Sequence, residues 1–155
     1  MSDLKDFYQK LAINRQGKKV VFTNGCFDII HAGHVQYLNQ AKSLGDILIV
    51  GLNSDDSIKR LKGSDRPINV QADRKIVLEG LRSVDNVLVF EEDTPYNLIQ
   101  NIKPDILVKG GDWAAEDIVG YDIVLANGGE VKSLLFVEGS STTSIIGKIM
   151  DQLKS

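Results

Sequence analysis

Residues 20–34 read VVFTNGCFDIIHAGH. The first three are apolar and mostly β-branched, which is typical of a strand buried in a parallel sheet. After the loop, residues 33–44 carry apolar side chains at helical spacing and are followed by Gly45, a residue type that commonly ends a helix. The stretch therefore predicts a buried strand, a loop with glycines, and a helix in direct succession.

The same alternation continues along the rest of the chain. Apolar runs predict four more strands, at residues 46–52, 86–90, 106–109 and 131–136. Amphipathic or capped segments predict helices at residues 4–13, 55–61, 71–84 and 118–126, from Thr94-Pro95 onward, and from the Ser/Thr cluster at 140–144 to about residue 153. This alternation predicts an α/β fold, a Rossmann-like open parallel sheet of five strands with helices on both faces. We expect residues 1–17 to form an N-terminal helix and residues 18–155 to form a single domain.

Composition narrows the classes of function. The chain has 155 residues and a net charge of −3, which suits one globular domain and gives no electrostatic case for binding nucleic acid or an anionic membrane. No apolar run approaches the roughly 20 residues that span a bilayer, and the N-terminus lacks the apolar core of a signal peptide. The chain has one cysteine, which fits a reducing compartment, so we expect a cytoplasmic location.

Three loops are expected at one edge of the sheet. In open parallel sheets, ligands bind beyond the carboxyl ends of the strands, near the point where strand order reverses. The loops that follow predicted strands at this edge are residues 23–34, 109–113 and 137–143. The first and third lead into helices, whose free N–H groups bind anions. The sequence therefore predicts a shared site for a phosphate-containing ligand.

Both histidines of the chain, His31 and His34, lie on either side of Gly33. Their spacing places the two imidazoles on the same side of a helix start, where both can donate hydrogen bonds to phosphate oxygens. Solvated surface histidines are one alternative. A zinc pair is another, although the sequence offers few further ligands for zinc. Neither the dinucleotide-binding pattern G-x-G-x-x-G nor a P-loop pattern is present.

The stretch GCFDIIHAGH resembles the signature of the HxGH nucleotidyltransferase superfamily, which has the cytidylyltransferase-like fold. This resemblance implies that His31 and His34 contact a nucleoside triphosphate as catalytic residues. It also implies that the rest of the loop lies against the nucleotide, through residues Asn24, Gly25, Cys26, Phe27 and Gly33. We do not expect Cys26 to act as a nucleophile.

A basic stretch follows the second predicted strand. Lys59 and Lys62 belong to it, and either could close a cation over the phosphates from a mobile loop. The resemblance favours Lys62 as the catalytic cation and leaves Lys59 as a candidate substrate contact. Arg82 matches a position whose arginine reaches the active site in the family, and the alternative for it is an ion pair with Glu79 or Asp85.

Two later motifs complete the candidate site. KGGDW, residues 109–113, and EGSSTT, residues 138–143, each follow a predicted strand. The resemblance places the first beside the nucleotide and matches the second to the family's second signature, while a tight turn and simple helix capping are the alternatives. The candidate nucleotide contacts are Gly111, Asp112, Trp113, Glu138, Ser141, Thr142 and Thr143. The candidate substrate contacts, besides Lys59, are Asp28 and Lys109.

Within the superfamily, the chain is most similar to the adenylyltransferase domain of bacterial ADP-heptose synthesis enzymes. The stretches LKGSDRPIN, KGGDW, EDIVGYDIV and ANGGEVKSLLFVEGSSTT carry this similarity. It implies transfer of AMP from ATP to a sugar 1-phosphate, D-glycero-β-D-manno-heptose 1-phosphate, for lipopolysaccharide or another surface glycan. Mg²⁺ is expected to bridge phosphate oxygens, with few protein ligands required.

Three alternatives stay open. A glycerol-3-phosphate cytidylyltransferase is one, although that group carries arginine where this chain has Phe136. A non-catalytic nucleotide-binding module on the same fold is the second. The third is an interaction protein that uses the N-terminal helix, with a second copy of the chain as a candidate partner.

Overall fold

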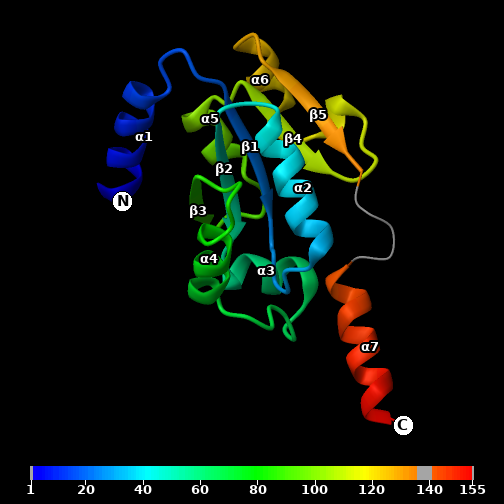
Figure 1. Ribbon diagram of the computed structural model, residues 1–155. Helices are drawn as coiled ribbons and strands as arrows, with labels where there is room; N and C mark the ends of the chain where they lie inside the picture. The colour runs from blue at the N-terminus through cyan, green and yellow to red at the C-terminus, as the bar shows by residue number, and fades with distance from the viewer. Residues whose placement is uncertain (1, 136–140, 155) are drawn as a thin grey trace.

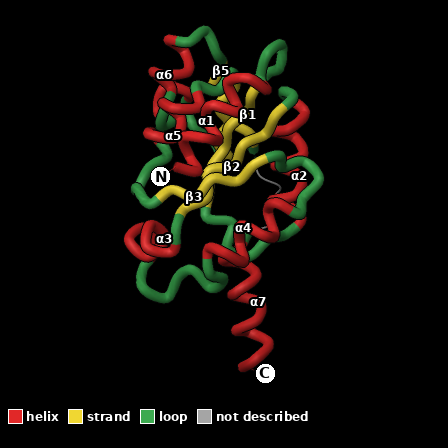
Figure 2. The backbone as a smooth tube through the Cα atoms, turned by 90° about the vertical axis from the view of Figure 1, so that its left-hand side faces the viewer, coloured by secondary structure: helices red, strands yellow, loops and turns green. Residues whose placement is uncertain are grey.

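The fold is an open sheet of five parallel strands between two layers of helices (Figures 1 and 2). The computed structural model describes residues 2–135 and 141–154. The spatial order of the strands is β3-β2-β1-β4-β5. Their bounds are β1 Val20–Gly25, β2 Ile47–Asn53, β3 Asn86–Phe90, β4 Ile106–Gly110 and β5 Glu130–Leu134.

Helices connect the strands and cover both faces of the sheet, as predicted. Strand residues alternate between two apolar clusters, because successive side chains of a strand point to opposite faces. One cluster holds Val21 with Leu38 and Leu78, and the other holds Phe22 with Ile99. The helices are α1 Ser2–Asn14, α2 Ala32–Ser43, α3 Asp55–Lys62, α4 Gln71–Glu79, α5 Tyr96–Ile102, α6 Tyr121–Ala126 and α7 Thr142–Lys154, with a short 3₁₀ turn at Ala115–Asp117.

Strand order reverses at β1. The chain moves from β1 outward to β2 and β3, then returns to the other side of β1 to form β4 and β5. The carboxyl end of β1 is therefore the switch point at which ligands bind in open α/β sheets. The N-terminus of α2 and the start of α7 lie at this end, and α7 extends away from the body of the domain (Figure 1).

Three sequence predictions need correction. The helix predicted for residues 71–84 ends at Glu79, where the chain turns at Gly80. The helix predicted for residues 118–126 begins only at Tyr121, because Gly120 has φ +93°, a left-handed conformation that interrupts a helix. The helix predicted to start at Thr94-Pro95 begins at Tyr96, with Pro95 in the capping position.

The N-terminal helix α1 packs on the sheet. Leu11 is buried in the same cluster as Phe22. Beyond the helix, Arg15 forms an ion pair of 3.2 Å with Asp105, which precedes β4. The predicted domain boundary after residue 17 stays a prediction. No helix within residues 2–135 and 141–154 is long and apolar enough to span a bilayer.

Candidate active site

A cavity of about 190 Å³ lies at the carboxyl ends of β1 and β4. The loop after β1, the end of β4 and the start of α7 all contribute to it, so segments from all three predicted loops meet there. Its lining residues are Asn24, Gly25, Cys26, Phe27, Asp28, His34, Tyr37, Lys62, Arg66, Lys109, Gly110 and Thr142.

The two histidines cap the N-terminus of α2. The N–H of Gly33 donates to Nδ1 of His31 over 3.1 Å, and the N–H of His31 donates to Nδ1 of His34 over 3.3 Å. Their rings stack with centroids 3.9 Å apart. A ring nitrogen that accepts a hydrogen bond carries no proton, so each neutral imidazole holds its proton on Nε2. The cap thus leaves each histidine with one Nε2–H donor.

Burial keeps both imidazoles uncharged at neutral pH. It lowers the pKa of His34 to about 4, with further lowering by the charges of His31 and Lys62. Burial also lowers the pKa of His31. Neutral rings can lie in stacked contact without mutual repulsion, and each still donates one hydrogen bond.

The lowered pKa of His34 predicts a dependence of stability on pH. The unfolded chain, with a histidine pKa near 6.5, takes up the proton before the folded chain does at about 4. The stabilising contribution of His34 is therefore complete above pH 6.5 and is lost as pH falls towards 4. In urea unfolding at pH 7.5, 6.0 and 4.5, we expect His34→Gln to lose less stability on acidification than the wild type does. Equal losses would contradict the assignment.

Phe27 and Gly25 shape the wall beside the histidines. Phe27 has φ 47°, a left-handed conformation that non-glycine residues rarely adopt and that clusters at functional sites. Its ring lies 5.3 Å from that of His34. A Cβ added at Gly25 would lie 2.9 Å from the Phe27 ring, so only glycine fits there without displacement.

Asp28 is buried and all its carboxylate contacts come from residues 66–69. Its Oδ2 accepts from Arg66 Nε at 3.1 Å and from the Ile68 N–H at 2.8 Å, and its Oδ1 accepts from the Asn69 N–H at 2.8 Å. Burial alone would raise the pKa of Asp28, but these hydrogen bonds and the Arg66 charge hold it below its usual value. The geometry ties the loop after β1 to the loop after α3.

Of the candidate lysine side chains, some line the cavity and others do not. Lys62 and Lys109 line it, and Lys109 Nζ also lies 4.4 Å from the ring centroid of Trp113. Lys59 is exposed and does not belong to the lining. The structure therefore brings one of the two candidate lysines of α3 to the cavity.

The start of α7 lies beside the loop after β1. Thr142 Oγ1 donates to the carbonyl of Ile29 over 3.2 Å, and Ser141 Oγ accepts from the Ser144 N–H over 2.9 Å as a helix cap. Thr143 is exposed in the first turn. Glu138 lies outside the described residues.

Several candidate residues within the described part of the chain lie outside the cavity lining: His31, Gly33, Lys59, Arg82, Gly111, Asp112, Trp113, Ser141 and Thr143. Gly111 has φ +114° and turns the chain after β4, which leaves Trp113 46% exposed. Arg82 is exposed beyond the end of α4.

Among the described residues, Arg82 does not form the alternative ion pair with Glu79 or Asp85. Glu79 pairs with Lys75 and Asp85 pairs with Lys42.

Three residues at or near the cavity are not among the site residues predicted from the sequence. Tyr37 hydrogen-bonds Thr23 at 2.6 Å, and burial raises its pKa to about 12. Arg66 approaches from the loop after α3, and Arg74 lies buried behind it. Arg66 belongs to the basic stretch of the sequence and Arg74 to the predicted helix at residues 71–84, but the sequence alone assigns neither to the site.

Cys26 is partly buried, and burial raises the pKa of its thiol. The thiolate needed for nucleophilic attack is therefore disfavoured at neutral pH. The described residues contain no group of three or more His, Cys, Asp or Glu side chains that could hold a metal ion.

A second cavity, of about 390 Å³, shares one wall with the first. Residues Asn24–Cys26, Lys62 and Lys109 line both cavities. On its far side, the second cavity is lined by Asp93, Thr94 and Pro95 before α5 and by Ile118 and Val119 before α6.

These features define a class. A loop after β1 that ends in a histidine-capped helix, at the switch point of a parallel sheet, is the arrangement of a nucleotidyltransferase domain. The chain belongs to the cytidylyltransferase-like family, whose model matches residues 22–147.

Curated relatives and a solved structure agree with this assignment. The chain is 63% identical over 134 residues to "Bifunctional protein HldE" of Campylobacter concisus, covering 86% of this chain and 28% of that protein. It is 54% identical over 157 residues to the protein of the same name from Aliarcobacter butzleri, covering 99% and 32%. The chain thus spans about a third of the length of these relatives. The crystal structure of the lipopolysaccharide core biosynthesis protein from Thermoplasma volcanium matches with a TM-score of 0.62 and 28% identity, over 79% of this chain and 99% of that one.

Proposed function

We propose that this domain transfers AMP from Mg²⁺–ATP to D-glycero-β-D-manno-heptose 1-phosphate, giving ADP-heptose and pyrophosphate. The observation that carries the proposal is the stacked pair of neutral imidazoles at the N-terminus of α2, of which His34 lines the cavity, together with the start of α7, whose Thr142 lines the same cavity. Helix N-termini and neutral N–H donors suit a polyanion. The choice of sugar rests on the similarity to ADP-heptose synthesis enzymes, and the relatives named HldE support it.

The reaction needs charge neutralisation more than a general base. A sugar 1-phosphate is largely dianionic at pH 7, because its second pKa is about 6. One of its oxygens attacks the α-phosphorus of ATP, the bond from that phosphorus to the bridging β-oxygen breaks, and pyrophosphate leaves with the electron pair. Catalysis then consists of positioning and stabilisation of the phosphoryl charge.

In this proposal, His31, His34 and Lys62 are the catalytic donors to the triphosphate. The loop after β1 and the start of α7 hold the nucleotide, and Mg²⁺ arrives with it as part of the substrate. The second cavity would take the sugar phosphate, since Asp93 and Thr94 offer polar groups for hydroxyls and Lys109 offers a cation for the phosphate. A cytoplasmic location and a homodimer belong to the same proposal.

The two lysines of α3 should differ in effect. Lys62 lines both cavities, whereas Lys59 lines neither. We expect Lys62→Ala to lower kcat/KM at least about tenfold, the loss of roughly 1.4 kcal/mol of transition-state stabilisation. Lys59→Ala should lower it less. Steady-state pyrophosphate release measures both, and an equal or larger effect of Lys59→Ala would reverse the assignment.

A pyrophosphate-release screen tests the proposed function. It pairs ATP or CTP with both anomers of the heptose 1-phosphate, with other sugar 1-phosphates and with glycerol 3-phosphate, all with Mg²⁺. The proposal expects the highest kcat/KM for ATP with the β-heptose 1-phosphate. Preference for CTP with glycerol 3-phosphate would replace it, and nucleotide binding without pyrophosphate release from any pair would favour a binding module.

A further inference from the structure

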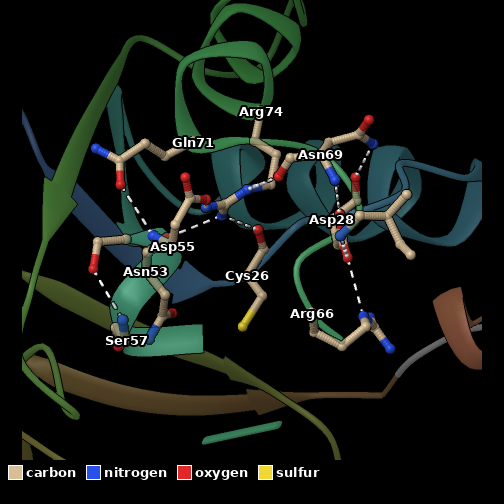
Figure 3. Close-up of polar contacts among 11 residues, drawn as sticks. Cys26, Asp28, Asn53, Asp55, Ser57, Arg66, Asn69, Gln71 and Arg74 are labelled. Carbon is tan, nitrogen blue, oxygen red and sulfur yellow. Dashed lines mark hydrogen bonds and ion pairs between the residues drawn. The ribbon is translucent and has the colours of Figure 1, made fainter. Parts of the chain in front are cut away.

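The guanidinium of Arg74 contacts three segments of the chain (Figure 3). Arg74 lies on α4 and is only 1% exposed. It donates to the carbonyls of Cys26 at 2.7 Å, Asn53 at 2.9 Å and Asn69 at 2.9 Å. It also forms an ion pair of 2.9 Å with Asp55. One side chain thus holds the loop after β1, the end of β2 and the loop after α3.

Asn69 extends this contact to Asp28. Its N–H donates to Oδ1 of Asp28, and its Nδ2 donates to the main-chain oxygen of Asp28 over 2.7 Å. We call Arg74, Asn69 and Asp28 the Arg74 brace. Arg66, whose Nε donates to Asp28 Oδ2, projects from the same loop and lines the cavity.

Packing alone does not require an arginine at this place. Burying a charge costs several kcal/mol, and a helix that faces a core usually carries an apolar residue there. The guanidinium instead offers five donors in a fixed planar fork, which can hold several carbonyls at set directions. Its contacts all go to segments that carry or adjoin cavity residues, while Arg74 itself does not line the cavity.

We propose that Arg74 is a positioning residue that sets the distance between the loop after β1 and the loop after α3. The brace holds Lys62 and Arg66 where they face a bound polyphosphate. This inference rests on the proposed function for its substrate, because the cations are placed for a triphosphate. Arg74 acts through these loops and makes no contact of its own with the nucleotide.

Arg74→Lys tests the inference. A lysine keeps the charge but cannot hold three carbonyls and Asp55 in the same directions. We expect a folded protein whose Kd for Mg²⁺ with a non-hydrolysable ATP analogue rises about tenfold and whose kcat falls about 10- to 100-fold, a range expected for a misplaced site. Lys75→Gln, on the next and exposed position of α4, is the control and should match the wild type.

A mutant cycle that pairs the Arg74 substitution with the combined Lys62→Ala and Arg66→Ala change separates a positioning role of Arg74 from a merely structural one. If Arg74 acts through the cations, its substitution should have little further effect on analogue affinity once Lys62→Ala and Arg66→Ala are both present. Full additivity, or a lowered unfolding midpoint with unchanged Kd and kcat, would overturn the inference.

Two further arrangements keep the test decisive. Should Arg74→Lys fail to fold, Asn69→Ala removes the Nδ2 contact from an exposed position, and the same cycle applies with a smaller effect, about threefold or more. The Kd of the ATP analogue still measures the effect of the Arg74 brace if the wild type releases no pyrophosphate with any sugar phosphate. That result would refute the proposed function, while the cycle would still support or refute the brace.

Discussion

Replacement of His34 by alanine is expected to lower kcat by about 100- to 1000-fold, the loss typical of a donor that acts on transition-state charge. His34 lines the cavity, and its Nδ1 accepts from the N–H of His31, so the proton of the neutral ring is on Nε2, which is its donor. The lowered pKa, about 4, keeps that donor neutral through the physiological range. Alanine removes the donor and leaves the rest of the loop in place.

Two controls accompany this variant. Gln36→Ala changes an exposed residue on the same helix and should leave kcat within about twofold of the wild type, as surface substitutions usually do. Circular dichroism and urea unfolding establish that His34→Ala is folded at the assay temperature. Turnover near that of the wild type by a folded His34→Ala protein would remove His34 from the catalytic role.

Asp28→Ala should have the largest effect on stability among single changes at the site. It leaves the Arg66 guanidinium and the N–H groups of Ile68 and Asn69 without their acceptor in a buried setting. Breaking a buried pair in this way typically costs about 3–5 kcal/mol, and Arg66 is partly exposed, so we expect a loss of about 3 kcal/mol. Urea unfolding at pH 7 measures it.

The pH dependence of this loss provides a second check. Because the folded pKa of Asp28 is below the ordinary 3.8, its contribution is complete above that value and is lost as pH falls through the folded pKa. The difference between wild type and variant should therefore shrink below pH 3.8. Asp65→Ala, which removes an exposed carboxylate from the loop after α3 that contacts Asp28, is the control. A loss for Asp28→Ala no larger than that of Asp65→Ala would contradict the account.

The spacing of residues close together in the sequence was enough to predict most of the fold and the proximity of the two histidines. The strands and α2 follow from apolar periodicity, and His31 and His34 share one helix start, so three residues of separation sufficed to place them together. The partners of Asp28 lie 38 to 41 residues away in the chain, and no local pattern reports such a contact. Sequence reasoning therefore assigned Asp28 to the substrate, a role that stays a prediction.

The two arginines of the α4 region show the same limit. Residues 71–84, which include both Arg74 and Arg82, are predicted from the sequence as one helix. The helix ends at Glu79, so Arg82 follows the turn at Gly80 into solvent, while Arg74 lies within the helix and is buried. The end of the helix depends on how the chain returns to β3, which is a tertiary feature.

The central claim is that both imidazoles and the start of α7 bind one triphosphate. A crystal structure with Mg²⁺ and a non-hydrolysable ATP analogue tests it most directly. The account predicts phosphate oxygens within hydrogen-bonding distance, about 2.7–3.2 Å, of Nε2 of His31 and His34, with the N-terminus of α7 facing the same phosphates. A triphosphate bound elsewhere, or bound with both rings turned away from it, would contradict the account.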